Sequence, residues 1–178
     1  MGYNPSYFKG KKDSPSRPVE TVSWNDIAGV AGFNSKTGLR LTTEAEWEYA
    51  CRGGTTTAIH STPERPKGSN QISQLRGIAW YEDNAAQTHP VGGKAPNAFG
   101  FYDMLGNVME WCNDYSDGAY YYRSPLTNPT GPSTSTTRIL RGGCFANHWY
   151  IYCRSSSRIG YTPGYRYLTI GFRVARTA

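Results

Sequence analysis

The last third of the chain constrains the fold most, because fixed residues there alternate with positions that follow no helix or strand period. Arg141–Gly143 opens this C-terminal segment and Ile170–Arg173 closes it. The residues that recur between them are Cys153, Arg154, Arg158, Pro163 and Arg166. A rigid set of residues that carries interchangeable loop positions is typical of a binding surface, since loops on a stable body hold many functional sites.

The positions between these fixed residues hold tyrosines, small residues and β-branched residues. Tyr offers large amphipathic contact area at low entropic cost, which suits recognition. The first candidate ligand-binding cluster is Phe145, Ala146, Asn147, His148, Tyr150, Ile151 and Tyr152. The second is Ile159, Gly160, Tyr161, Thr162, Gly164, Tyr165, Tyr167, Leu168 and Thr169. The alternative is a loop whose aromatic side chains only pack on the body of the domain.

Size and composition fit one loop-rich domain that spans residues 1–178. A chain of 178 residues is long enough for a single hydrophobic core. Only 38% of the residues are hydrophobic, and 20 glycines favour loops over long helices. Aromatic residues make up 14% and charged residues 18%, a balance that argues against disorder.

Two capping signals predict two short helices. Ser23 precedes a helix over residues 24–33, with Asp26 at its third position. Thr43 begins a capping box for a second helix over residues 44–52.

The strand signals are short and widely spaced. Strands are predicted at residues 39–41, 107–112, 139–143 and 171–176, with an extended piece at residues 89–92. Residues 55–95 show no sustained period and are expected to be mostly irregular. The sum of two small helices, several short strands and long loops is an α+β fold.

The net charge of +6 raises the question of a nucleic-acid partner. The arginines of the C-terminal third are spaced singly among apolar residues, which favours internal hydrogen bonding to carbonyls and carboxylates. We therefore expect no nucleic-acid binding. No apolar run reaches the length of a membrane span and no signal peptide is found, so membrane insertion is not expected.

Four cysteines occur at positions 51, 112, 144 and 153, and none forms a Cys-x-x-Cys pair. Zinc binding is therefore not predicted. Buried free thiols are the expected state, and a Cys112–Cys153 disulfide is the alternative.

Ordered segments along the whole chain resemble the formylglycine-generating-enzyme domain, which has a C-type-lectin-like fold. They are Asn4–Gly10, Pro18–Glu20, Val22–Asp26, Leu39–Ala50, His89–Gly92, Pro96–Met104, Gly106–Trp111, Arg141–Gly143 and Gly171–Arg173. The resemblance implies that fold, with short antiparallel strands. Members of the family carry early strands ahead of the first of these segments, so a fragment or a shortened variant is expected, whose last strand either lacks a partner or finds a substitute.

The enzymes of this family resemble one another in two C-terminal cysteines that bind copper. The corresponding positions here are approximately Asn147 and Tyr152. Since Cu(I) requires soft thiolate ligands, we expect no copper and no enzyme activity. A copper-dependent formylglycine-generating oxidase is kept as an alternative.

The spacing of the C-terminal segment resembles a branch of this fold, the variable proteins of diversity-generating retroelements. Arg158 is followed by four free positions, Pro163, two free positions, Arg166, three free positions and Ile170–Arg173. The resemblance implies a non-enzymatic protein with a diversified ligand- or receptor-binding surface over residues 141–173. Its implied partner is a macromolecule such as a cell-surface protein, and its implied location is a phage particle or a bacterial surface. An undiversified accessory domain is the remaining alternative.

A calcium site is implied by the same resemblance. Its four positions correspond to Asp103, Gly106, Val108 and Glu110, with two side-chain oxygens and two backbone carbonyls as ligands. Oxygen ligands of this kind suit a hard cation. The alternative is that Glu110 pairs with an arginine.

Overall fold

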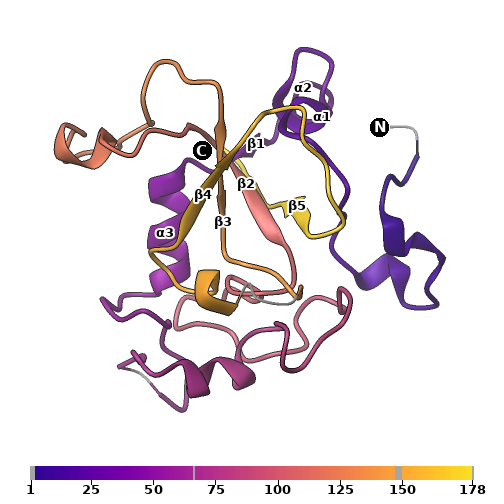
Figure 1. Cartoon of the computed structure of the whole chain (residues 1–178), viewed down its shortest axis with the longest axis vertical. Coiled ribbons are helices and arrows are strands. Elements are labelled where there is room, and N and C mark those ends of the chain that lie inside the picture. Colours follow the sequence, from indigo (N-terminus) through magenta and orange to yellow (C-terminus); the bar gives the residue numbers. More distant parts are fainter. Residues whose placement is uncertain (1–2, 66, 147–149, 178) are drawn as a thin grey trace.

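A four-stranded mixed sheet organises the fold (Figure 1). The computed structural model describes residues 3–65, 67–146 and 150–177. The strand order is β4-β3-β2-β5. These strands are Arg158–Tyr161 (β4), Arg138–Arg141 (β3), Met109–Tyr115 (β2) and Ile170–Phe172 (β5). β3 pairs antiparallel with β2 and β4, as the expectation of short antiparallel strands requires, whereas β5 runs parallel to β2.

The sequence analysis predicts no strand at β4, and this is also wrong. All four residues of β4 are half-buried, so no alternation of exposed and buried positions marks the strand in the sequence. Pairing with β3 specifies it instead, with Arg141 opposite Arg158 and Arg138 opposite Tyr161.

A second, two-stranded sheet joins β1 (Arg40–Leu41) to β6 (Val174–Ala175). The strand predicted at residues 171–176 is thus divided into β5 and β6. β1 pairs antiparallel with β6, with Leu41 opposite Val174. The piece predicted as extended at residues 89–92 ends in a turn and forms no strand.

Two α-helices begin at the predicted capping boxes. In α1 (Trp24–Ala28) the side chains of Ser23 and Asp26 each accept a hydrogen bond from the other's backbone N–H. In α3 (Glu44–Arg52) Thr43 and Glu46 do the same. Short 3-10 helices lie at Tyr7–Gly10, Ser14–Ser16, Ile72–Gly77, Tyr120–Tyr122 and Tyr150–Tyr152.

The helix predicted over residues 24–33 is too long. It ends at residue 28, and a further helix, α2, covers Phe33–Thr37. Two glycines explain the break: a β-carbon on Gly29 would lie 2.4 Å from the carbonyl oxygen of Asn25, and one on Gly32 would lie 2.5 Å from that of Ile27. The chain therefore turns sharply where any other residue would clash with the preceding helix.

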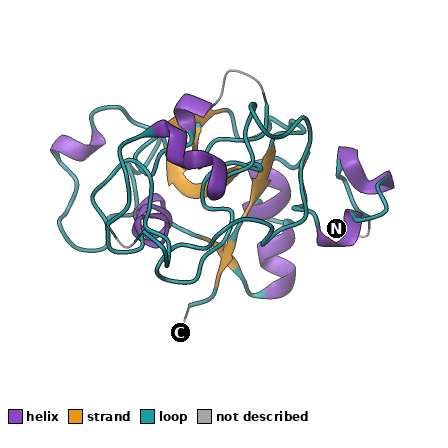
Figure 2. Cartoon of the chain, turned by 90° about the horizontal axis from the view of Figure 1, so that it is seen from below, coloured by secondary structure: helices purple, strands orange, loops and turns teal. Residues whose placement is uncertain are grey.

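Strand β2 carries core residues on both of its faces. Met109 and Trp111 pack with Leu140 and other buried side chains in one cluster. Cys112 belongs to a second cluster with Trp47 of α3. Figure 2 shows loops surrounding this small sheet, as an α+β fold with long connections requires.

All four cysteines are buried thiols outside any disulfide, so the alternative Cys112–Cys153 disulfide is not formed. Among the residues that the structure describes, no helix has both the length and the apolar character needed to cross a membrane.

Candidate ligand-binding surface

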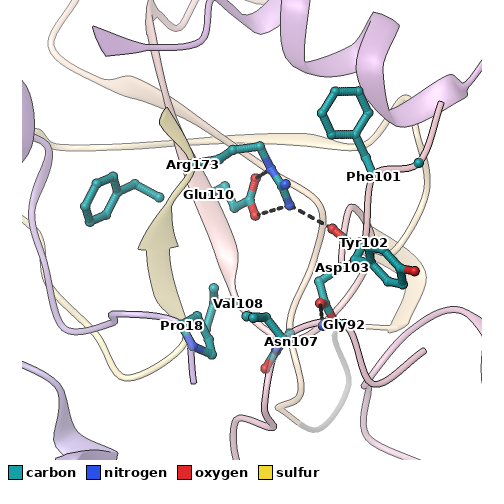
Figure 3. Close-up of a pocket in the computed structure, with 12 residues that line it drawn as sticks. Pro18, Gly92, Phe101, Tyr102, Asp103, Asn107, Val108, Glu110 and Arg173 are labelled. Carbon is teal, nitrogen blue, oxygen red and sulfur yellow. Dashed lines mark hydrogen bonds and ion pairs between the residues drawn. The ribbon is translucent and has the colours of Figure 1, made fainter. Parts of the chain in front are cut away.

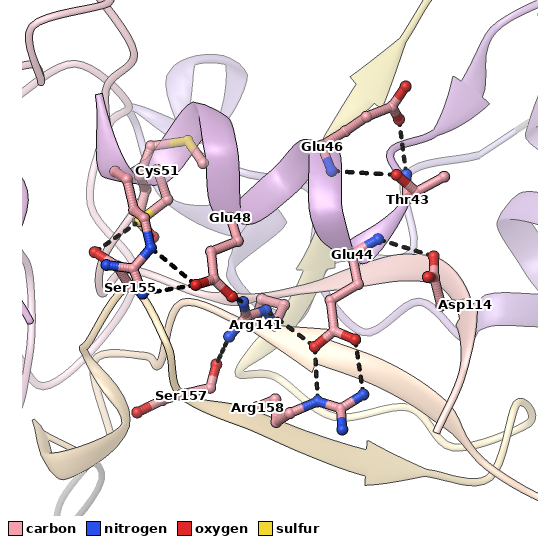
Figure 4. A network of polar contacts seen from close by, with 12 residues as sticks. Thr43, Glu44, Glu46, Glu48, Cys51, Asp114, Arg141, Ser155, Ser157 and Arg158 are labelled. Carbon is pink, nitrogen blue, oxygen red and sulfur yellow. Dashed lines mark hydrogen bonds and ion pairs between the residues drawn. The ribbon is translucent and has the colours of Figure 1, made fainter. Parts of the chain in front are cut away.

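The C-terminal segment begins in a buried ion-pair network (Figure 4). The side chain of Arg141, at the end of β3, is 0% exposed. Its guanidinium contacts the carboxylate of Glu48, lies 3.4 Å from that of Glu44 and donates to the carbonyl of Ser157. A buried charge is tolerated only when it is paired and hydrogen-bonded. Arg141 therefore ties β3 to α3 and to the loop before β4.

Arg158 attaches the first residue of β4 to the same helix. Its Nε and Nη2 each lie 2.7 Å from an oxygen of Glu44, and its Nη1 donates to the carbonyl of Asp117 at 3.0 Å. Such a bidentate pair fixes direction as well as distance. The second candidate cluster begins in β4, and β4 is held against α3 at its start. Arg158 pairs with Glu44, and Arg141 binds the carbonyl of the preceding residue, Ser157.

Asp114 adds a titratable carboxyl group to this network. Burial raises the pKa of Asp114 to about 6, and the nearby Glu44 carboxylate also raises it. The backbone N–H of Glu44 donates to Asp114 Oδ2 at 2.8 Å and acts in the opposite direction. Folding therefore disfavours the ionised form of Asp114 relative to the unfolded chain, which destabilises the folded protein above about pH 6.

Backbone hydrogen bonds hold the loop after β4 against the N-terminal part of the chain. The N–H of Asn25 donates to the carbonyl of Pro163 at 3.1 Å, and the N–H of Thr21 donates to that of Tyr167 at 3.2 Å. These bonds use none of the loop's side chains. The loop is thereby positioned while its side chains stay available for other contacts.

Arg166 provides a side-chain attachment to the same region. Its Nη2 lies 2.8 Å from Asp26 Oδ1, and the other oxygen of Asp26 accepts from the backbone and hydroxyl of Ser23. One carboxylate therefore caps α1 and holds the loop. The Arg166 side chain is 52% exposed, so this pair contributes more to position than to stability.

Three tyrosines are stacked on this loop and form what we term the tyrosine surface: Tyr161, Tyr165 and Tyr167. The rings of Tyr161 and Tyr165 are 4.7 Å apart and 11° from parallel, and those of Tyr165 and Tyr167 are 6.3 Å apart and 19° from parallel. Tyr165 is 38% exposed and Tyr167 is 51% exposed, while Tyr161 is half-buried. The stack lies at the surface, as ligand contact requires.

A hollow of about 60 Å³ lies among these rings. The residues that line it are Met109, Ala146, Tyr161, Tyr165, Tyr167, Thr169 and Ile170. It brings Ala146 of the first candidate cluster together with members of the second. Met109 and Ile170 belong to the hydrophobic core, so the tyrosine surface rests on a rigid apolar floor.

The structure corrects three of the predicted ligand-binding positions. Phe145 is only 4% exposed and packs edge-on against Phe8, with ring centroids 5.8 Å apart. Thr169 is 3% exposed, because it directly precedes β5 and its carbonyl accepts from the N–H of Met109. Gly160 lies in β4, where a β-carbon would come within 2.7 Å of the Ser116 hydroxyl. Phe145 and Gly160 therefore offer no side chain to a ligand, and Thr169 contributes only to the lining of the hollow.

The remaining predicted positions fall into three groups. Ile151, Thr162 and Gly164 are exposed, and Ala146, Tyr152, Ile159 and Leu168 are half-buried. Asn147 and His148 lie outside the described residues, and the structure does not describe the side chain of Tyr150. Ligand contact by any of them stays a prediction.

Glu110 forms the arginine pair that was the alternative to a calcium site. Its two carboxylate oxygens lie 2.9 and 3.0 Å from the guanidinium of Arg173, and the indole N–H of Trp47 donates to it at 2.7 Å. Asp103 accepts from the N–H of Gly92 at 2.7 Å through Oδ2, while its Oδ1 has no hydrogen-bond partner.

These contacts do not fit a calcium site in this arrangement. A calcium ion takes six to eight oxygen ligands, often from several carboxylates, and Glu110 is already neutralised by Arg173. In the described part of the chain, no three His, Cys, Asp or Glu side chains gather in a metal-binding group. Calcium binding stays a prediction that requires Glu110 to leave its arginine.

Sequence reasoning missed the carboxylates that hold the surface in place. Glu44 and Glu48 lie one turn apart on α3 and receive Arg141 and Arg158. Their i, i+4 spacing on a predicted helix was the available signal. The sequence does not show which arginines pair with them, because the paired residues lie up to 114 positions apart in the chain.

The fold is the C-type-lectin-like fold of the formylglycine-generating type. Residues 1–178 match the FGE-sulfatase family model, described as a sulfatase-modifying factor enzyme 1-like domain, and the chain belongs to this family. The formylglycine-generating enzyme of Streptomyces coelicolor is 38% identical over 173 residues, which cover 92% of this chain and 54% of that protein. The chain spans about half the length of the curated relatives it matches.

Two solved structures share the arrangement of the chain. Treponema denticola variable protein 1 superimposes with a TM-score of 0.77 at 29% identity, covering 98% of this chain and 77% of that one. PvdO from Pseudomonas aeruginosa gives a TM-score of 0.70 at 29% identity, covering 92% of this chain and 63% of that one. The same fold is thus found in proteins named as enzymes and in one named as a variable protein.

Proposed function

We propose that this chain is a non-enzymatic binding protein, the variable protein of a diversity-generating retroelement. The observation that carries the proposal is the exposed tyrosine surface on a loop held by Arg158, Pro163 and Arg166. Likeness to the Treponema denticola variable protein supports it. Its ligand is a macromolecule at a cell surface, reached from a phage particle or a bacterial surface, and a specific complex would bury about 800 Å² on each partner.

Sequencing around the gene tests the diversification. We expect a reverse-transcriptase gene and a near-identical copy of the stretch encoding the C-terminal segment, differing from it mainly at adenines. A gene neighbourhood without both elements contradicts the retroelement and favours an undiversified accessory domain.

Binding to intact host cells tests the surface itself. The double variant Tyr165→Ala/Tyr167→Ala is expected to lose at least tenfold in affinity, because exposed tyrosines are frequent hot spots. Tyr49→Ala/Tyr122→Ala is the matched control, since these tyrosines are 69% and 93% exposed elsewhere on the chain. Equal losses in both double variants would count against the proposed surface.

The second candidate function is a copper-dependent formylglycine-generating oxidase, which the 38% identity to an enzyme of that name favours. The cysteine positions of such enzymes correspond here to Asn147 and Tyr152. The thiols that are present are buried, and burial raises the pKa of Cys51 to about 12 and that of Cys144 to about 11. Oxidation of a cysteine-containing peptide by the chain with Cu(I) and oxygen, followed by mass spectrometry, decides between the two: turnover would exclude the non-enzymatic proposal.

A further inference from the structure

A hollow of about 440 Å³ lies apart from the tyrosine surface (Figure 3). Its volume is in the range of small-molecule sites. Val108 and Glu110 line it, whereas Met109 lines the hollow under the tyrosine surface. Because successive residues of a strand point to opposite faces, the side chains of Met109 and Glu110 leave β2 on opposite sides.

The rim of this hollow is apolar, aromatic and open to solvent. Val91 is 56% exposed, Phe101 is 40% exposed and Tyr102 is 44% exposed, and Phe172 and Pro18 continue the wall. Grouped exposed apolar side chains mark interaction sites. The faces of aromatic rings attract cations in particular.

The interior of the hollow carries a net negative charge within a protein of net charge +6. Asp103, Glu110 and Arg173 are the charged residues that line it. Arg173 neutralises Glu110, so the carboxylate of Asp103 is left in excess. Asp103 is only 8% exposed, yet its Oδ1 has no hydrogen-bond partner. A buried acceptor without a donor is costly, which favours a ligand that supplies one.

We propose that this hollow binds an organic cation on an apolar stem, of the kind that a lysine side chain of a partner polypeptide presents. The ammonium group donates to Asp103, and the stem lies along Phe101 and Tyr102. A calcium ion takes six to eight oxygen ligands, and Glu110 is engaged by Arg173, whereas an ammonium group is a donor that is satisfied by few acceptors. The inference does not depend on the function proposed for the tyrosine surface.

Titration with n-pentylammonium, followed by calorimetry or by NMR shifts of the lining residues, tests the proposal. Saturable binding is expected, at least tenfold tighter than that of neutral n-pentanol. Asp103→Asn should bring the amine down to the affinity of the alcohol. Asn tolerates the φ of 54° at this position and can still accept from Gly92, so the fold should be kept.

Three further variants separate binding at the site from effects on the fold and on surface charge. Phe101→Ala, which removes a half-exposed wall, should weaken the amine about threefold to tenfold. Glu64→Gln neutralises an exposed carboxylate elsewhere, and Tyr165→Ala alters the other surface; both should leave amine binding unchanged. Equal affinity for amine and alcohol, or amine binding unaffected by Asp103→Asn, overturns the proposal. Calcium binding that depends on Asp103 while amines fail to bind overturns it as well.

Discussion

The two ends of the C-terminal segment are held in opposite ways. At one end the side chains of Arg141 and Arg158 are 0% and 19% exposed and are bound by the carboxylates of α3. At the other end Arg166 is 52% exposed and the loop is attached mainly through backbone hydrogen bonds. Buried ion pairs therefore fix where the loop starts, and backbone hydrogen bonds then position the rest of the loop with little use of its side chains.

The largest effect is expected at the buried end. Arg141→Ala removes the donor to Glu48 Oε2 and to the Ser157 carbonyl, although Arg52 still pairs with Glu48 Oε1. Because a buried charge pair loses one partner, the free energy of unfolding should fall by about 3–5 kcal/mol. Arg154→Ala, an exposed arginine of the same segment, should change it by less than about 0.5 kcal/mol. Urea unfolding of both variants measures the two changes in the free energy of unfolding. Equal losses would contradict the special role of the buried Arg141 ion pairs.

A pH-dependent effect is expected next, at Asp114. Its pKa is raised to about 6 in the folded protein, so its contribution to stability is present below its ordinary pKa and is lost as the pH rises through 6. Asp114→Asn should therefore stabilise the protein by about 1–3 kcal/mol at pH 8 and by nearly nothing at pH 4. Unfolding at the two pH values checks the sign, and a gain that is larger at pH 4 would contradict the assignment.

A smaller effect is expected from Arg166→Ala. Loss of an exposed ion pair should cost less than about 1 kcal/mol of global stability. Hydrogen exchange at the amides of Thr21 and Asn25 should nevertheless become faster, because both donate to the loop that Arg166 positions. Arg176→Ala, also exposed, serves as the control and should leave these two amides unchanged.

The smallest effect on stability is expected at the tyrosine surface. The double variant Tyr165→Ala/Tyr167→Ala removes exposed rings and should change the free energy of unfolding by less than about 1 kcal/mol. Thermal melting with circular dichroism measures this. A loss as large as that of Arg141→Ala would mean that the rings act as core residues and not as a contact surface.

Local signals predicted the starts of helices better than their ends. Ser23 and Thr43 begin α1 and α3 because capping depends on residues three positions away. The early end of α1 depends on a close approach at Gly29, which one sequence does not reveal. The fixed arginines could be recognised by spacing, but their carboxylate partners and the burial of Phe145 and Thr169 arise from distant parts of the chain.

The strand order determines which mutations the loop between β4 and β5 can tolerate. β4 and β5 are the two edge strands of the four-stranded sheet, so residues 162–169 connect one edge of the sheet to the other. β4 and β5 run in the same direction, so the loop must also return along the strands, from the level of Tyr115 to that of Met109. Three interstrand spacings amount to about 14 Å and the return to roughly 20 Å, a diagonal of about 24 Å, against about 30 Å for the fully extended connection. Substitutions should therefore be tolerated in this loop, whereas deletion of several residues would strain the sheet. This loop should therefore tolerate mutation that substitutes bases and keeps the length of the gene unchanged.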